Sequence, residues 1–142
     1  GDTVSAKADV SKCQDGVNES IAGEKMSFVS GSAYLSVASN RLIEKVAVAF
    51  KPCSGLAIAV DGHTDDNGPA DTNKNLSQER ADRVRQALID RGIPEKLVSA
   101  TGHGSEKPLV EGSNAAADAQ NRRIEFTITK ADAGQIETQQ GE

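Results

Sequence analysis

A carboxylate and a guanidinium stand 15 residues apart in a polar part of the chain, at Asp65 and Arg80. If the intervening loop doubles back, both side chains can lie on the same side of the helix that carries Arg80. Asp65 would then accept hydrogen bonds from a ligand ammonium group. Arg80 would bind a ligand carboxylate through two parallel hydrogen bonds, a geometry that lysine cannot supply. Such a pair suits a zwitterion with both charges on one carbon, but a salt bridge that only ties loop to helix remains the alternative.

The elements around this pair are a buried strand and a long helix. Residues 56–60 form a continuous apolar run, which is typical of a strand covered on both faces. Residues 71–90 carry apolar side chains at helical spacing, and Gly92 and Pro94 end the helix. The polar segment 61–69 joins the two. Since ligands often bind where strand-exit loops meet helix N-termini, we expect the binding site at this junction.

The remaining periodicity predicts one α+β domain. In order, it indicates a helix at 10–21, a strand at 25–29, a helix at 36–50, a strand at 97–101, a loop at 102–120 and a strand around 124–128. After the leading helix the order is therefore β-α-β-α-β-β. We expect a two-layer sandwich with helices packed on a small mixed four-stranded sheet. We expect residues 1–9 to be flexible, 10–130 to form the domain, and 131–142 to be a disordered tail.

The composition of the chain argues against nucleic acid and against a membrane-spanning segment. The chain has 142 residues, enough for one ordinary domain, and aromatic side chains make up only 3% of it. A net charge of −5 with so few rings offers nucleic acid neither a basic stripe nor a stacking surface, so we expect no nucleic-acid partner. No apolar run is long enough to span a bilayer. We therefore expect any membrane association to depend on an upstream segment.

The two cysteines, Cys13 and Cys53, have no histidine at zinc-binding spacing. They are either two buried thiols or one disulfide, and the residues themselves leave both possibilities open. A disulfide would place the protein in an oxidising compartment.

Four short motifs occur in order along residues 62–125. They are Gly-His-Thr-Asp at 62–65, Asn73 followed by Leu-Ser-x-x-Arg-Ala at 76–81, Gly-His-Gly-Ser-x-x-Pro at 102–108 and Asn-Arg-Arg-Ile-Glu at 121–125. Together they resemble the signature of the OmpA-like peptidoglycan-binding domain family, and the resemblance extends more weakly back to Phe28, over roughly two-thirds of the chain. It implies a domain of the periplasm or cell envelope that is not an enzyme and needs no cofactor. Such a domain binds the meso-diaminopimelate of uncrosslinked peptidoglycan stem peptides and anchors a membrane-associated protein to the cell wall.

The resemblance also implies roles for individual residues. Asp65 corresponds to the ammonium acceptor and Arg80 to the carboxylate ligand. The residues expected to line the pocket are Thr64, Asn73, Leu76 and Ser77, and those expected to close its far side are Asn121 and Arg122. Since Arg122 and Arg123 alternate along the predicted last strand, only one of them is expected to reach the site.

The comparison with the family pattern has two further consequences. Some relatives pair cysteines at similar places, so the resemblance implies a Cys13–Cys53 disulfide. Three positions depart from the pattern, namely Val29, His103 and Asp118. The acid at 118 is expected near the ligand's carboxylate, where it would weaken or retune binding.

Two other interpretations belong to different classes. His63, Asp65, Asp66 and His103 are potential metal ligands, but the two acids are adjacent and no histidine pair has helical spacing. No water-activating glutamate is evident either, so a metal-binding hydrolase is a minor alternative. The third interpretation is a structural or protein-binding module whose ligand site has decayed. The presence of both charged anchors argues against it.

Overall fold

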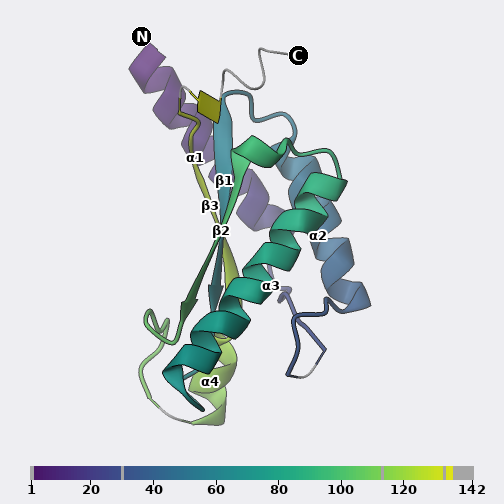
Figure 1. The fold of residues 1–142 in the computed structure, drawn as a ribbon. Helices are drawn as coiled ribbons and strands as arrows, with labels where there is room; N and C mark the ends of the chain where they lie inside the picture. The colour runs from purple at the N-terminus through teal and green to yellow at the C-terminus, as the bar shows by residue number, and fades with distance from the viewer. Residues whose placement is uncertain (1, 30, 113, 133, 136–142) are drawn as a thin grey trace.

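The computed structural model describes residues 2–29, 31–112, 114–132 and 134–135, with side chains from residue 9 onward (Figure 1). Its helices are α1 (Asp2–Ser20), α2 (Val37–Phe50), α3 (Ala70–Asp90) and α4 (Ala115–Asn121), with one 3-10 turn, η1 (Glu95–Leu97). Its strands are β1 (Leu56–His63), β2 (Val98–Gly104) and β3 (Arg123–Lys130). The predicted α+β class is confirmed.

The three strands form one mixed sheet in the order β2-β1-β3. The central strand β1 is parallel to β2 and antiparallel to β3, so Asp61 pairs with Thr101 on one side and with Glu125 on the other. Side chains alternate between the two faces of each strand. One face of the sheet is therefore apolar and receives the helices, while the other carries Asp61, Thr101 and Glu125.

The expected fourth strand at 25–29 is not formed in the described part of the chain. Only an isolated bridge joins Phe28 to Leu35 there. The segment folds back on itself, because Gly31 adopts a φ of +68° and the Val29 N–H donates to the Tyr34 carbonyl at 2.8 Å. The backbone groups that would pair with a sheet are thus used within this turn.

The hydrophobic core lies between the sheet and the helices. Helix α3 packs on β1 and β2, α1 packs on β3, and α2 packs on both α1 and α3 (Figure 1). Small and branched aliphatic side chains dominate this core. Its largest fully buried side chains are those of Val17, Ile43, Val46, Ile58, Val60, Val84 and Leu88. This packing fixes α3, which carries Arg80, against the strand ends.

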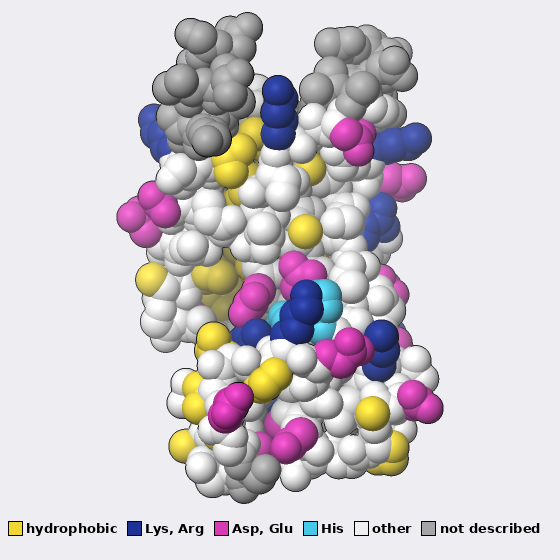
Figure 2. All heavy atoms as spheres, turned by 90° about the vertical axis from the view of Figure 1, so that its left-hand side faces the viewer, with side chains coloured by type: hydrophobic (Ala, Val, Ile, Leu, Met, Phe, Trp, Pro, Cys, Tyr) yellow, Lys and Arg dark blue, Asp and Glu magenta, His cyan; other side chains and the backbone are white. Residues whose placement is uncertain are grey.

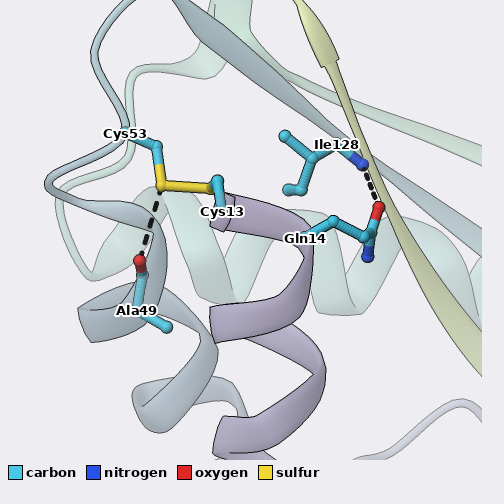
Figure 3. Close-up of a disulfide and its surroundings, with 5 residues drawn as sticks. All are labelled: Cys13, Gln14, Ala49, Cys53 and Ile128. Carbon is cyan, nitrogen blue, oxygen red and sulfur yellow. Dashed lines mark hydrogen bonds between the residues drawn. A yellow bond between two sulfur atoms is a disulfide. The ribbon is translucent and has the colours of Figure 1, made fainter. Parts of the chain in front are cut away.

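Helix α1 covers the β3 edge of the sheet through Gln14. Its side-chain amide donates to the Phe126 carbonyl at 2.8 Å. Its amide oxygen accepts from the Ile128 N–H at 2.8 Å (Figure 3). One side chain therefore mimics a neighbouring strand at two exposed backbone groups of β3.

The predicted disulfide between Cys13 and Cys53 is present, with 6.1 Å between the Cα atoms (Figure 3). It joins α1 to the turn that follows α2. A closed loop with a sequence separation of 40 corresponds to about 4 kcal/mol of stabilisation in the chain-entropy model. The bond holds α1 in the position from which Gln14 reaches β3.

Several element boundaries differ from expectation. Helix α1 begins at Asp2 rather than near residue 10. Strand β1 continues to His63, so the first three residues of the predicted loop 61–69 belong to the sheet. Within the predicted loop 102–120, a short helix α4 begins after Asn114, whose side chain accepts a hydrogen bond from the Ala117 N–H.

The predicted tail begins at a residue that belongs to the fold. Ala131 is buried, and its N–H donates to the Gly55 carbonyl at 2.9 Å. Residues 136–142 of the predicted tail lie outside the described residues. None of the helices in the described ranges is both long enough and apolar enough to cross a bilayer.

Candidate functional site

Two glycines let α3 lie directly on the C-terminal ends of β1 and β2. A Cβ atom at Gly62 would lie 2.5 Å from the Ser77 carbonyl oxygen, and one at Gly102 would lie 2.2 Å from the Gln78 nitrogen. The Ser77 hydroxyl donates to the Lys74 carbonyl and accepts from the Gly104 N–H, both at 2.9 Å. The helix is therefore fixed on the strand ends, and with it the position of Arg80 one turn further on.

The loop after β1 is held in one conformation by its own polar groups. The Thr64 N–H donates to the Gly104 carbonyl at 2.8 Å, and the buried Asn73 amide donates to the Asn67 carbonyl at 2.9 Å. The Asp65 carboxylate accepts from the Asn67 N–H at 3.0 Å. Thr64 and Asn73 thus position the loop that carries Asp65.

Asp65 is paired with Arg122 rather than with Arg80. The distance between Asp65 Oδ2 and Arg122 Nη1 is 2.6 Å, with side-chain exposures of 12% and 48%. Burial alone would raise the pKa of Asp65, but hydrogen bonds from Arg122 and Asn67 outweigh it and lower that pKa below its ordinary value. Asp65 is therefore a largely enclosed carboxylate whose charge is satisfied by the protein itself.

Arg80 has its side chain fixed while its terminal nitrogens stay available. Its Nε donates to the Ser32 carbonyl at 2.9 Å, and its guanidinium carbon lies 4.7 Å from the centroid of the Phe28 ring. Within the described residues, its two terminal nitrogens form no hydrogen bond. Burial and the charge of Arg122 lower the pKa of Arg80, while Asp65 opposes that shift. The three charged groups are thus close enough to influence one another.

The guanidinium of Arg80 borders a cavity of about 410 Å³ between α3, the 25–31 segment and the start of β3. We call it the basic cavity, because its described lining residues include Lys25, Arg80, Arg122 and Arg123 and no acid. The chain as a whole carries a net charge of −5. This local excess of positive charge favours an anionic group as the occupant.

The predicted site residues are divided between two hollows. Ser77, Arg80 and Arg122 line the basic cavity. Thr64 and Asn121 line a separate hollow of about 170 Å³. Neither hollow is lined by Asp65, Asn73 or Leu76.

Asn121 is committed to the fold. Its side-chain oxygen accepts from the Leu109 and Val110 N–H groups, and its amide donates to the Val110 carbonyl. The side chain of Asn121 therefore organises the preceding loop.

The expectation that only one of Arg122 and Arg123 reaches the site is wrong, since both line the basic cavity. Strand alternation does not apply to them, because Arg122 is the C-cap of α4 and only Arg123 belongs to β3. Lys25 and Phe28 were not predicted as site residues. The turn that folds 25–35 back toward α3 brings them to the cavity, and no sequence motif marks that turn.

Asp118, one of the departures from the family pattern, contacts the loop that carries Asp65. One of its oxygens accepts from the Asn67 side-chain amide at 2.9 Å. Its backbone carbonyl accepts from the Arg122 N–H at 3.1 Å. Asp118 thus connects α4 to the loop that carries Asp65.

The histidines occupy the face of the sheet that the helices leave uncovered, where Figure 2 shows them gathered among charged side chains of both signs. Their rings stack with centroids 4.9 Å apart, and His103 Nε2 lies 2.7 Å from Asp61 Oδ1. The His63 ring is 3% exposed, and its nitrogens have no hydrogen-bond partner within the described chain. Burial, followed by the charge of Arg123, lowers the pKa of His63 to about 4.

The arrangement does not assemble the ligands weighed for a metal. In the described ranges, no group of three or more His, Cys, Asp or Glu side chains is placed to hold a metal ion. His63 and His103 face each other, whereas Asp65 turns toward Arg122.

Comparison with known proteins gives matches over most of the chain. The model of the OmpA family matches residues 27–122. The probable lipoprotein YiaD of Escherichia coli K12 is 38% identical over 104 residues, covering 73% of this chain and 48% of YiaD. The peptidoglycan-binding protein ArfA of Mycobacterium tuberculosis H37Rv is 29% identical over 115 residues, covering 81% of this chain and 35% of ArfA. The chain thus spans about half or less of the length of these curated relatives.

A solved structure extends the likeness to three dimensions. The peptidoglycan-associated lipoprotein from Burkholderia pseudomallei superimposes with a TM-score of 0.67 at 29% identity, covering 75% of this chain and 91% of that one. The matched family segment contains Asp65, Arg80 and Arg122, the three charged groups that act on one another. On this evidence the chain belongs to the OmpA family.

Proposed function

We propose that this domain binds peptidoglycan non-covalently and anchors a membrane-associated protein to the cell wall, in the periplasm or cell envelope and without enzymatic activity. Two of its relatives are named for peptidoglycan, the binding protein ArfA and the lipoprotein from Burkholderia pseudomallei. The disulfide agrees with an oxidising compartment. Since the curated relatives extend well beyond the matched region, the attachment to a membrane is expected to lie in another segment of the whole protein.

We further propose that the ligand group is the dipolar end of meso-diaminopimelate. Asp65 accepts hydrogen bonds from its ammonium group, and Arg80 binds its carboxylate with both terminal nitrogens. The observation that carries this proposal is the state of Arg80: Phe28 and the Ser32 carbonyl fix its side chain, while its terminal nitrogens remain unused at the basic cavity. A guanidinium held in this way loses little conformational freedom when it binds a carboxylate.

The other predicted residues have supporting roles in this proposal. Thr64, Asn73 and Ser77 hold the loop and helix that present the two anchors, and Leu76 adds to the same helix surface. Asn121 and Arg122 close the far side, Asn121 through the loop it organises and Arg122 through its guanidinium. Asp118 is linked to the loop through Asn67, so its carboxylate is expected to tune the site through that contact.

Sedimentation with purified sacculi and calorimetry with a diaminopimelate stem tripeptide test the proposal. Asp65→Asn and Arg80→Gln should each reduce tripeptide affinity at least tenfold, because each leaves one ligand charge without its partner. The matched control is Glu79→Gln combined with Arg83→Gln. These changes remove one charge of each sign from α3 at residues that do not line the basic cavity.

Three results separate the candidate functions. Wild-type binding that both anchor variants weaken at least tenfold and the control retains supports the proposal. Equal binding by the wild type and both anchor variants refutes the assigned site. Absence of wild-type binding to sacculi and tripeptide would instead favour the decayed protein-interaction module.

A further inference from the structure

We propose that Arg122 makes the site selective for dipolar ligands over simple amines by exchanging partners. In the free protein it neutralises Asp65, and on binding it moves to the ligand's carboxylate while the ligand's ammonium takes its place. The inference rests on the proposed function, because it concerns how the same site chooses its ligand.

The first support is that the acceptor is occupied. Asp65 Oδ2 lies 2.6 Å from Arg122 Nη1, while Oδ1 accepts from the Asn67 N–H within the loop. The Asp65 side chain is only 12% exposed, so little of it is left for an incoming ammonium. Arg122 is 48% exposed and is therefore the partner that can leave without disrupting the loop.

The second support is the difference between the two neighbouring arginines. Arg123 is 14% exposed and donates to the Glu125 carboxylate and to the Asn121 and Lys107 carbonyls. Among the described residues, the Arg122 side chain forms a hydrogen bond only with Asp65. The Arg122 backbone N–H is held by the Asp118 carbonyl. Its guanidinium can thus move while the junction of α4 and β3 stays fixed.

The third support is the balance of charge. In the free site the Asp65 carboxylate pairs with the Arg122 guanidinium, and the charges of both act on the Arg80 guanidinium. A zwitterion supplies one charge of each sign, so its carboxylate can take both arginines while its ammonium takes Asp65. A simple amine supplies only positive charge. It would leave Arg122 without an acid beside Arg80, an arrangement that like-charge repulsion disfavours.

A simple carboxylate has a different outcome. It can bind Arg80 without opening the Asp65–Arg122 pair, so Arg122 gives no selectivity against it. Removing the Arg122 charge should therefore change the preference between a dipolar end and an amine end, and leave the affinity for a lone carboxylate comparatively little changed.

The test uses three stem tripeptides that differ only in the third side chain. It ends in the dipolar centre of meso-diaminopimelate, in the single ammonium of lysine, or in a single carboxylate. In wild-type protein the diaminopimelate tripeptide should bind far more tightly than the lysine tripeptide. In Arg122→Gln that ratio should fall at least tenfold, mainly because the lysine tripeptide gains affinity once Asp65 is free. Arg122→Lys, which keeps the charge, should restore most of the ratio.

The matched control is Lys25→Gln. Lys25 also lines the basic cavity, but it donates to the Ala119 carbonyl and not to Asp65. Loss of the Lys25 charge should weaken binding of the two tripeptides whose third side chain carries a carboxylate by a similar factor. The exchange of partners by Arg122 should be unaffected. The NMR titration of the Asp65 carboxylate, measured without ligand, reports on the pair directly. Its pKa should rise in Arg122→Gln.

The outcomes for the two proposals are distinct. If wild-type protein binds the diaminopimelate tripeptide and Arg122→Gln keeps the wild-type ratio, partner exchange is overturned while peptidoglycan binding stands. If the Asp65 titration is the same in both proteins, the pair does not exist in solution and the exchange is again overturned. If wild-type protein binds no tripeptide but the Asp65 pKa rises in the variant, the proposed function fails and takes the selectivity with it.

Discussion

Replacing Gly102 with alanine measures how closely α3 lies on the sheet. The added Cβ would meet the Gln78 nitrogen at 2.2 Å, the Gln78 Cα at 2.5 Å and the Ser77 Oγ at 2.7 Å. Two of these atoms are backbone, so the helix itself must move. Overpacking of a close-packed contact costs roughly 1–3 kcal/mol, and a backbone contact belongs at the upper end, at about 3 kcal/mol. With a urea m-value of about 2 kcal/mol/M, the unfolding midpoint should fall by about 1.5 M.

The matched control is Gly16→Ala in α1, where an added Cβ finds nothing within 4 Å. That change should stabilise the protein by roughly 0.5–1 kcal/mol, because alanine is the better helix former. Both variants are compared by urea unfolding followed by circular dichroism, with the disulfide oxidised. A Gly102→Ala protein within about 0.5 kcal/mol of wild type would refute the close approach of α3. The assignment of Arg80 to its present position would then lose its structural basis.

Two further predictions concern stability. Replacing both Cys13 and Cys53 with serine should cost about 4 kcal/mol in urea unfolding, and identical midpoints for the oxidised and serine proteins would contradict that role. His63, 3% exposed, has a pKa lowered to about 4, so the unfolded chain binds more protons than the folded one between about pH 4 and 6.5. Stability should therefore fall by about 3 kcal/mol as the pH drops through that window. His63→Phe should flatten this dependence, and an equally steep loss in the variant would assign it to other groups.

The parts of the fold that were predictable are those with a strong local signal. Two elements were placed correctly. The apolar run predicted β1, and the helical spacing of apolar side chains, ended by Gly92 and Pro94, predicted α3. Strand β1 was predicted too short because Asp61 and His63 are polar, and only the uncovered face of the sheet makes such residues compatible with a strand. Helix α4 was missed because seven residues give too little periodicity, although Asn114 and the alanines after it match a capped helix start.

The approach of Asp65 to Arg80 was predictable from the sequence, whereas the pairing of Asp65 with Arg122 was not; the ligand-binding roles of Asp65 and Arg80 stay predictions. The spacing of Asp65 and Arg80 indicated a split receptor, and the structure brings Asp65, in the loop before α3, close enough for its charge to act on Arg80 in the middle of that helix. That Asp65 binds Arg122 depends on where α4 ends, and the sequence has no local pattern for this. The position of Lys25 at the basic cavity likewise depends on the turn at Gly31, which replaces the expected strand.

The position of Gln14 has a consequence for how the chain matures. The chain is made from its N-terminus, so Cys13 and Cys53 are both available before residues 123–130 emerge. Once that bond closes, α1 is already held where the last strand will arrive. When β3 folds, it pairs with β1 along one edge and forms hydrogen bonds with the Gln14 side-chain amide along the other. Its outer backbone is occupied as it docks, which keeps it from pairing with the edge of another copy.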